Sequence, residues 1–131
     1  MKVLKIESKK YPEVVEIDSS LESLQKEVGG PIQAVYPWDD LVALICNEEG
    51  KLNGLELNRE LIADDGEPID VIAGTFLIVG LTEDDFGDLP QELIDKFDGI
   101  FHQPKEFRIV HGKCGNTLIG IHPYTPENGA K

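Results

Sequence analysis

The amino-acid sequence predicts an α+β fold, with a curved, mainly antiparallel sheet and two main helices. Short aliphatic and β-branched runs alternate with clusters of turn residues, as in strands joined by hairpins. Two other segments carry apolar residues at helical spacing. The expected order is β-β-α-β-β-β-β-α-β-β. Because it lacks a regular alternation of strand and helix, a parallel sheet is disfavoured.

The first three elements are a predicted hairpin and a helix. Residues 3–6 and 14–17 are β-branched runs on either side of a loose loop. In residues 18–30, DSSLESLQKEVGG, Ser19 and Glu22 form an expected capping box, and the Gly-Gly pair supplies a stop. The buried face of this helix is expected to carry Leu21, Leu24 and Val28.

The middle of the chain contains the most apolar predicted strand, residues 41–46, which follows a short strand at 31–36. Such a continuous apolar run predicts a strand covered on both faces of the sheet. The next segment, NEEG at 47–50, has the composition of a type I turn closed by a left-handed glycine. Residues 51–53 are therefore expected to run back antiparallel to the strand. Leucines from Leu52 onward are expected to anchor a connector that is part strand and part helical turn.

Two glycine signals shape the strands that follow. Asp64-Asp65-Gly66 predicts a hairpin turn. It leads into residues 68–79, which are expected to form one long strand bent at Gly74, since a glycine inside an apolar strand marks a bend. After an acidic loop, Asp88 is expected to cap a second helix that starts near Pro90.

At 131 residues the chain has the length of one ordinary domain. The expected organisation is a single α+β domain over residues 1–105 and a C-terminal hairpin extension over residues 106–131. The strands of the hairpin are expected at 107–110 and 117–121, and the tail from Pro123 is expected to be frayed.

Charge is the strongest global feature. The net charge is −13, from 25 acidic and 12 basic residues. The excess of acidic residues lies in residues 39–98, which contain seventeen acids and three bases and so have a net charge of −14. Such a field repels nucleic-acid phosphates and anionic membranes, so direct binding to either is disfavoured. The same field favours a basic protein as partner, although a solvated acidic face is the commoner reason for such a charge.

The sequence favours a cytoplasmic location. Lysines interrupt the N-terminal segment MKVLKIESKK, so it lacks the apolar run of a signal peptide. No stretch of about 18 apolar residues is present. The two cysteines, Cys46 and Cys114, are too few for a disulfide scaffold and are expected to be reduced.

Several kinds of chemistry lack support in the sequence. No phosphate-binding glycine motif and no complete EF-hand loop is present. No nucleophile motif is complete either, so an enzyme is disfavoured and no cofactor or metal is predicted. His111, Cys114 and His122 are the one set with metal-like spacing, and without a paired ligand motif they indicate a solvated turn more than a zinc site. Their convergence is left open.

One candidate set for partner binding combines an aromatic residue with acids. Trp38 in the segment YPWDD is a candidate interface anchor, and the alternative is a tryptophan packed over the sheet edge. The acids of this set are Asp39, Asp40, Asp64, Asp65, Asp84 and Asp85.

A second candidate set is a ligand pocket near Asn58, Arg59 and Asp70. Arg59 could hold a carboxylate or phosphate with two parallel hydrogen bonds. The favoured alternative is a structural ion pair with Glu56 or Glu60. Asp70, between Ile and Val in a predicted strand, is the one acid in a strand expected to be buried, and the alternative is that its position in the strand faces water.

Three stretches, AVYPWDDLVALICNEEGKLNGLELNREL, DVIAGTFLIVG and DFGDLPQEL, carry a family resemblance. Over roughly residues 1–105 the chain resembles a family of small bacterial and phage proteins known as domain-of-unknown-function family 3846. Membership implies occurrence in bacteria, their phages and conjugative elements, beside accessory genes that include antirestriction proteins. It implies no activity, ligand or catalytic residue, and it does not extend to residues 107–131.

The leading hypothesis from the sequence is a non-enzymatic accessory protein whose acidic middle binds a basic or DNA-handling protein. A narrower alternative is a DNA mimic of the antirestriction type, because rows of carboxylates can imitate phosphate spacing. The other alternative is a small ligand-binding protein or enzyme with its pocket near Asn58, Arg59 and Asp70. The sequence leaves the oligomeric state open.

Overall fold

The structure is a computed structural model that describes residues 1–112, 115 and 117–126. Two helices and ten strands occur in these residues. They are β1 (Lys2–Ile6), β2 (Glu13–Glu16), α1 (Leu21–Val28), β3 (Ile32–Val35), β4 (Val42–Asn47), β5 (Leu57–Ile62), β6 (Pro68–Ala73), β7 (Phe76–Leu81), β8 (Phe86–Gly87), α2 (Gln91–Phe101), β9 (Lys105–His111) and β10 (Thr117–Pro123).

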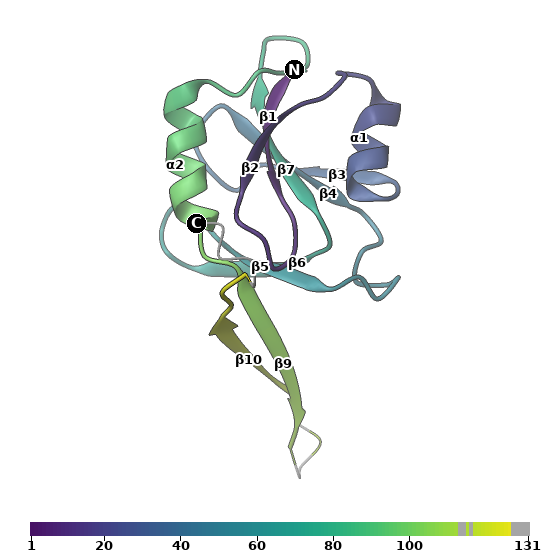
Figure 1. The fold of residues 1–131 in the computed structure, drawn as a ribbon, viewed down its shortest axis with the longest axis vertical. Coiled ribbons are helices and arrows are strands. Elements are labelled where there is room, and N and C mark those ends of the chain that lie inside the picture. The colour runs from purple at the N-terminus through teal and green to yellow at the C-terminus, as the bar shows by residue number, and fades with distance from the viewer. Residues whose placement is uncertain (113–114, 116, 127–131) are drawn as a thin grey trace.

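Three antiparallel sheets form the β structure. The main sheet has the order β2-β1-β7-β4-β3, with β8 beside β7; β5 pairs with β6, and β9 pairs with β10. Helices α1 and α2 lie on either side of the main sheet (Figure 1). The fold is thus α+β with mostly antiparallel pairing and two helices, which confirms the predicted class.

The core has two layers because the central strands bury both faces. All six residues of β4 are buried, as predicted for a strand covered on both sides. Alternate residues point to opposite faces. Leu44 and Ile78 pack with Ile94 and Phe97 of α2, whereas Ala43 and other residues of the opposite face pack with Leu24 and Val28 of α1.

Helix α1 begins one residue later than predicted. Ser20 is the N-cap, and its hydroxyl accepts a hydrogen bond from the Ser23 backbone N–H at 3.1 Å. The capping box of Ser19 and Glu22 is therefore wrong. The predicted buried face is right for Leu24 and Val28, but Leu21 is exposed. The predicted glycine stop is confirmed, since Gly29 caps the helix with φ +82°.

The NEEG segment does not form the predicted hairpin. Strand β4 pairs with β3 and β7, and residues 51–53 form turns instead of a strand, closed by hydrogen bonds such as Asn53 N–H to the Glu49 carbonyl. Gly50 is not in the left-handed conformation. Leu52 is 84% exposed, so it anchors nothing in the described part of the fold.

Gly50 is required for a different reason, which gives a testable result. A Cβ at Gly50 would lie 2.8 Å from the backbone oxygen of Ala73, which belongs to β6 and cannot turn away. Gly50→Ala should lower the free energy of unfolding by about 1–3 kcal/mol. In helix α2, nothing lies within 4 Å of a Cβ at Gly99, so Gly99→Ala should raise it by about 0.5–1 kcal/mol.

Urea denaturation of the two glycine variants measures both changes. Equal effects of the two substitutions would contradict the close approach of Gly50 to Ala73, because both variants add the same methyl group.

The turn at Asp64-Asp65-Gly66 is as predicted. Gly66 has φ +85°, and the Ala63 N–H donates to the Glu67 carbonyl to close the β5–β6 hairpin. The predicted long strand over residues 68–79 is bent at Gly74, where φ is +83°. The bend is large enough to place β6 and β7 in different sheets.

Asp88 does not cap helix α2, contrary to the prediction. Its Oδ1 accepts a hydrogen bond from the Lys2 backbone N–H at 2.7 Å. The N-cap of α2 is Pro90, without a side-chain cap. The carboxylate of Asp88 therefore ties the start of β1 to the segment between β8 and α2, a contact between residues far apart in the sequence.

The C-terminal hairpin projects from the rest of the structure (Figure 1). Its base is held by two hydrogen bonds, Tyr124 N–H to the Pro104 carbonyl at 2.9 Å and Gln103 Nε2 to the Tyr124 carbonyl at 3.0 Å. Lys105 also pairs with Glu60 of β5 at 3.6 Å. The division into a domain and an extension stays a prediction. The frayed tail predicted from Pro123 is wrong at its start, because Pro123 pairs with Lys105 and Tyr124 is hydrogen-bonded, whereas residues 127–131 lie outside the described residues.

Candidate functional site

The predicted ligand-binding pair Asn58 and Arg59 lies in the core. Both residues are buried, and every bond is made inside the fold. The Asn58 amide donates to the carbonyls of Ile6 at 2.9 Å and Gly74 at 2.8 Å. Arg59 donates from Nε to the Phe101 carbonyl at 3.0 Å, and from Nη2 to the Lys10 carbonyl at 2.7 Å.

Arg59 is a structural clamp, but not through the ion pair that the sequence suggested. Glu56 pairs with Lys9 at 3.0 Å, and Glu60 pairs with Lys105. The guanidinium also bonds the Asn58 side-chain oxygen at 2.8 Å. Burial lowers the pKa of Arg59 to about 10, so it stays charged at neutral pH. Its bond to the last residue of α2 places this charge at the negative end of the helix dipole.

Asp70 lies apart from this pair. It is exposed and forms an ion pair with Lys51, and its Oδ1 also accepts a hydrogen bond from the Val71 N–H at 2.8 Å. Of the two alternatives for Asp70, burial in the strand is therefore wrong and exposure to water is correct. Asn58 and Arg59 are buried and internally bonded, and neither lines a hollow that Asp70 lines.

Trp38 is buried, so it cannot be the exposed anchor that the first interpretation required. It is 8% exposed, and its indole Nε1 donates to the Ile62 carbonyl at 3.0 Å. Its ring packs against Phe97 and Phe101, with ring centres 4.6 and 6.0 Å apart. The alternative, a tryptophan packed in the fold, is correct. The exposed aromatic of this segment is Tyr36, which is 59% exposed.

Four of the candidate acids come together at one corner of the fold. The Asp39 backbone N–H donates to the Asp64 carboxylate at 2.9 Å, which joins the loop after β3 to the β5–β6 turn. Asp40 pairs with Lys96 of α2 at 2.8 Å, and this hydrogen bond raises the pKa of the lysine. We call Asp39, Asp40, Asp64 and Asp65 the acidic corner.

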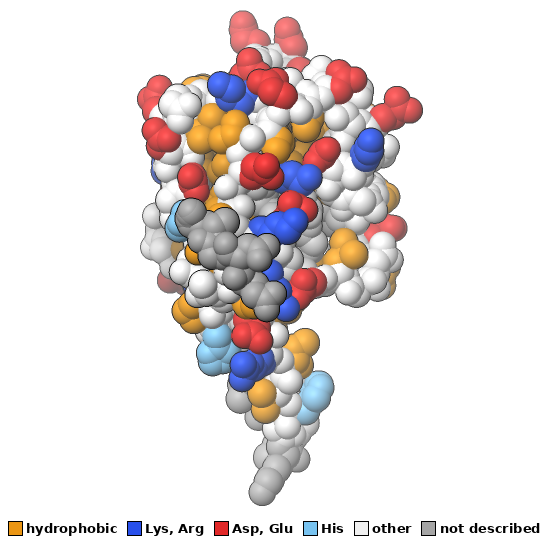
Figure 2. Space-filling view, in the orientation of Figure 1, with side chains coloured by type: hydrophobic (Ala, Val, Ile, Leu, Met, Phe, Trp, Pro, Cys, Tyr) orange, Lys and Arg blue, Asp and Glu red, His pale blue; other side chains and the backbone are white. Residues whose placement is uncertain are grey.

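Asp84 and Asp85 belong to a different loop, between β7 and β8. The loop is closed by its own bonds, from Thr82 N–H and hydroxyl to the Asp85 carbonyl, both at 2.8 Å. It lies at the end of the molecule that carries the N-terminus, where Figure 2 shows several acidic side chains. The structure thus does not join all predicted acids into one set.

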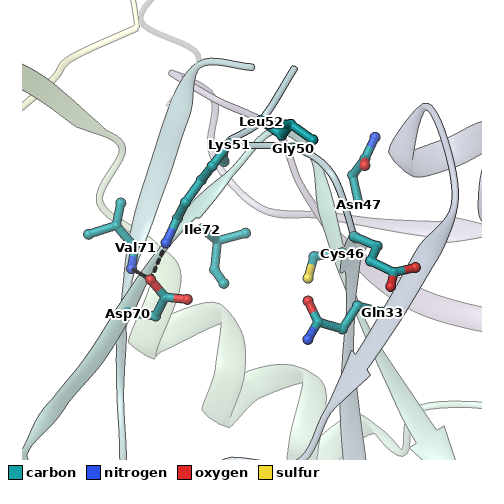
Figure 3. A pocket seen from close by; sticks show the side chains of 11 residues that line it. Gln33, Cys46, Asn47, Gly50, Lys51, Leu52, Asp70, Val71 and Ile72 are labelled. Carbon is teal, nitrogen blue, oxygen red and sulfur yellow. Dashed lines mark hydrogen bonds and ion pairs between the residues drawn. The ribbon is translucent and has the colours of Figure 1, made fainter. Parts of the chain in front are cut away.

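A groove lies between the β3–β4 part of the main sheet and strand β6. It consists of two adjoining hollows of about 310 and 240 Å³. Figure 3 shows Gln33 and Cys46 on one side and Asp70 with Lys51 on the other. Four residues line both hollows: Gln33, Cys46, Asp70 and Ile72.

The groove leads to the acidic corner. Its second hollow is lined by Tyr36 and Pro37, which directly precede Trp38 and Asp39, and by Ile69, which follows the β5–β6 turn. Ile69 and Tyr36 are both more than half exposed. Exposed apolar side chains therefore line the end of the groove that is formed by segments next to the acidic corner in the sequence.

The only thiol described in the groove is not prepared for nucleophilic chemistry. Burial raises the pKa of Cys46, with a further contribution from Asp70 that Lys51 partly opposes. A raised pKa keeps the thiol protonated at neutral pH. No His lines the two hollows, so no general base stands beside the sulfur.

The inertness of Cys46 can be measured. In a Cys114→Ser variant, alkylation of Cys46 by iodoacetamide at neutral pH should be far slower than in the same chain unfolded in urea. As the pH is raised through the range in which an ordinary thiol ionises, the alkylation rate should increase at lower pH in the unfolded chain than in the folded chain. Equal rates in the folded and unfolded chains would show that the thiol is accessible and ionised.

The metal-like set does not converge in the described part of the chain. His111 pairs with Thr117 and His122 with Glu106, so the two histidines lie five positions apart along the β9–β10 ladder, roughly 17 Å. Cys114 lies outside the described residues. Across residues 1–112, 115 and 117–126, no group of three or more potential metal ligands occurs. In the same residues, no helix has the length and hydropathy to cross a membrane.

Of the residues that line the groove, Asp70 was a sequence candidate, whereas Gln33 and Lys51 were not. Gln33 was a visible signal, because it is the one polar residue in the apolar strand β3. The ion pair of Lys51 with Asp70 had no local signal, since it depends on the long turn after β4 and on the placement of β6.

Comparison with known proteins gives a family but no function. No curated protein and no solved structure matches this chain. Residues 1–102 match the model of a family described as "Domain of unknown function (DUF3846)". The match covers more than half of the 131 residues and includes the groove and the acidic corner. The chain therefore belongs to the DUF3846 family.

Proposed function

We propose that this protein is a non-enzymatic binding module that docks a basic segment of a partner protein at the acidic corner and the adjoining groove. The observation that carries the proposal is the convergence of Asp39 and Asp64, from loops 25 residues apart, in segments that also carry the exposed side chains of Tyr36 and Ile69.

The composition of this surface supports a protein partner. Protein interfaces combine an apolar centre, often aromatic, with a polar rim. Here Tyr36 and Ile69 supply exposed apolar area, and the carboxylates stand at one end. Trp38 supports this surface from the core. Its packing on α2 and its hydrogen bond to the Ile62 carbonyl fix the loop that carries Asp39.

The charge of the corner supports a basic partner. Lys96 pairs with Asp40, whereas among the described residues no lysine or arginine lies within ion-pair distance of Asp39, Asp64 or Asp65. Lysine or arginine side chains of a partner would find carboxylates there that have no direct ion pair, although Lys96 lies close enough to Asp64 for its pKa, raised mainly by Asp40, to be raised further by that carboxylate. The net charge of −13 would also speed the encounter with a basic surface.

The test is a pull-down from a bacterial lysate at low and high salt. The native protein should capture basic proteins at low salt and release most of them at high salt, because exposed charges are screened. A variant with Asp39→Asn, Asp64→Asn and Asp65→Asn should lose the capture. The asparagine at 64 keeps an oxygen that can accept the Asp39 N–H bond.

The matched control changes the same number of charges elsewhere. Glu83→Gln, Asp84→Asn and Asp85→Asn neutralise the β7–β8 loop, whose closing bonds involve the Thr82 hydroxyl and the Asp85 backbone. This variant should capture what the native protein captures. If both variants behave alike, capture depends on total charge and the proposed site is wrong.

We propose that the protein acts in the cytoplasm of bacteria. Its genes would occur in bacteria and also in phages and mobile elements. The buried free thiol of Cys46 is compatible with a reducing compartment. Fractionation of cells that express the protein at natural level tests this setting, and recovery from the periplasm would contradict it.

A further inference from the structure

The hairpin of β9 and β10 is a separate two-stranded sheet, so the outer edge of β10 is unpaired in the described part of the chain. Strand β9 pairs with β10, and no other described strand pairs with the outer edge of β10. In an antiparallel strand about half of the backbone N–H and C=O groups point away from a given neighbour. Such a row of free groups is a template on which another strand can pair.

Several other sheet edges in the described part of the chain are protected, and the free edge of β9 carries the charged residues Lys105, Glu106 and Arg108. Strand β2 carries Glu13 and Glu16 at its two ends, and β8 has only two residues. Prolines flank β3 on both sides. Strand β6 begins with Pro68, and the Asp70 carboxylate occupies the Val71 N–H. Charges, prolines and short strands are the ordinary means by which proteins prevent edge pairing.

Strand β10 lacks these features over most of its length. It has seven residues, TLIGIHP, without any Asp, Glu, Lys or Arg, and its only proline is the last residue. Its seven pairs with β9 run in register without a bulge. Ile119 is 46% exposed and Ile121 is 36% exposed. An exposed, regular and uncharged edge of this length is suited to pairing with another chain.

The hairpin also has too little packing to be stable as it stands. A two-stranded ribbon alone is marginal in water, and it needs further strands or a packed face. The distal half of this hairpin projects from the structure (Figure 1), and Ile109 and Val110 are more than half exposed there. A further strand beside β10 would supply the missing neighbour.

We propose that the neighbour is β10 of a second copy, paired antiparallel across a two-fold axis to give a continuous four-stranded sheet, β9-β10-β10-β9. Antiparallel pairing of a strand with its own copy is self-complementary, as a two-fold interface requires. Each copy would place Ile119 and Ile121 beside the same strand of the other copy, at cross-strand distance.

The charge distribution makes contact between two copies through the hairpins less costly than contact between their acidic middles. Residues 1–98 hold 23 acids and 8 bases, a charge of −15, whereas residues 99–131 hold 2 acids and 4 bases, a charge of +2. Two bodies of −15 repel each other at short range. Contact through the projecting hairpins keeps the bodies apart and joins the copies through the one segment that is not acidic.

The mass of the full-length protein in solution tests the inference. Light scattering after gel filtration should give twice the 14.5 kDa of one chain. The dimer should strengthen as salt is raised, because salt screens the repulsion between the bodies. The double variant Ile119→Lys, Ile121→Lys should be monomeric, since it places like charges opposite each other in adjacent strands.

A matched control separates edge pairing from loss of the hairpin or docking on its face. Ile109 pairs with Ile119 in the ladder and is 57% exposed, but it lies on β9, which does not take part in the proposed contact between the two β10 strands. Ile109→Lys should leave the dimer intact. A monomeric native protein at every salt and concentration, or a dimer that survives the double variant, would overturn the inference. So would equal loss of the dimer in Ile109→Lys.

Salt distinguishes this inference from the proposed function. Binding of a basic partner at the acidic corner weakens with salt, whereas dimerisation strengthens. The two surfaces also share no residue, so either can fail while the other stands.

Discussion

Arg59→Ala is expected to lower the free energy of unfolding by about 3–5 kcal/mol. The substitution removes the donors that satisfy the buried carbonyl of Phe101 and the partly buried carbonyl of Lys10, and it leaves a cavity where a 2% exposed side chain lay. Those carbonyls lie 42 and 49 residues away in the sequence. The clamp thus joins β5 to the end of α2 and to the loop between β1 and β2.

Urea denaturation of Arg59→Ala measures this loss, with Arg108→Ala as the control. Arg108 is exposed, and its nearest acid is Glu106 at 3.7 Å, so its removal should change stability by less than about 0.5 kcal/mol. Similar effects of the two substitutions would contradict the buried clamp. Arg59→Lys should recover only part of the loss, because one ammonium cannot reach all the acceptors that the guanidinium bonds.

Trp38→Ala should have an effect of similar size, about 3–5 kcal/mol. The indole fills the space between β5 and α2, where it contacts Phe97 and Phe101 and bonds the Ile62 carbonyl. Its removal leaves a cavity and frees the loop that carries Asp39. Trp38→Phe should lose less, since the ring packing is largely kept and only the N–H bond is absent.

Thermal unfolding and tryptophan fluorescence measure the role of Trp38. In the native chain its emission should shift to longer wavelength on unfolding, because the ring is 8% exposed in the fold. Tyr36→Ala is the control, since Tyr36 is 59% exposed and should change stability little. A stable Trp38→Ala variant would place the indole outside the core.

Features set by neighbouring residues were predictable from the sequence. The turn at Gly66, the end of α1 at Gly29 and the burial of β4 all follow from local composition and period. The shift of the N-cap from Ser19 to Ser20 is a local error, because either serine can cap a helix.

Features that depend on distant contacts were not predictable. Asp88 has the position of a helix cap but bonds Lys2, 86 residues away. Gly50 has the position of a turn glycine but is required by the Ala73 backbone. The sequence shows which residues are polar, but not which backbone carbonyls will lie within hydrogen-bond distance of them. Arg59 was therefore expected to pair with an acid, whereas it bonds backbone oxygens.

The same limit explains the outcome for the candidate site. Acidity of the middle segment was evident, but the grouping of Asp39 with Asp64 required the packing of the β5–β6 turn against the loop after β3. That packing also buries Trp38 and leaves Tyr36 exposed. The aromatic residues next to acids in the sequence therefore indicated the segment around Trp38. Only the fold showed that Tyr36 is the exposed side chain there.

An NMR titration with a peptide of alternating lysine and valine is the most direct test of the central claim, that the acidic corner and groove bind a basic segment. Binding at this surface should shift the amide resonances of Tyr36, Asp39, Asp64 and Ile69. At low salt the shifts should saturate with increasing peptide, and they should become smaller as the salt concentration is raised. Equal shifts in the β7–β8 loop at Asp84, or no saturable shifts at all, would contradict it.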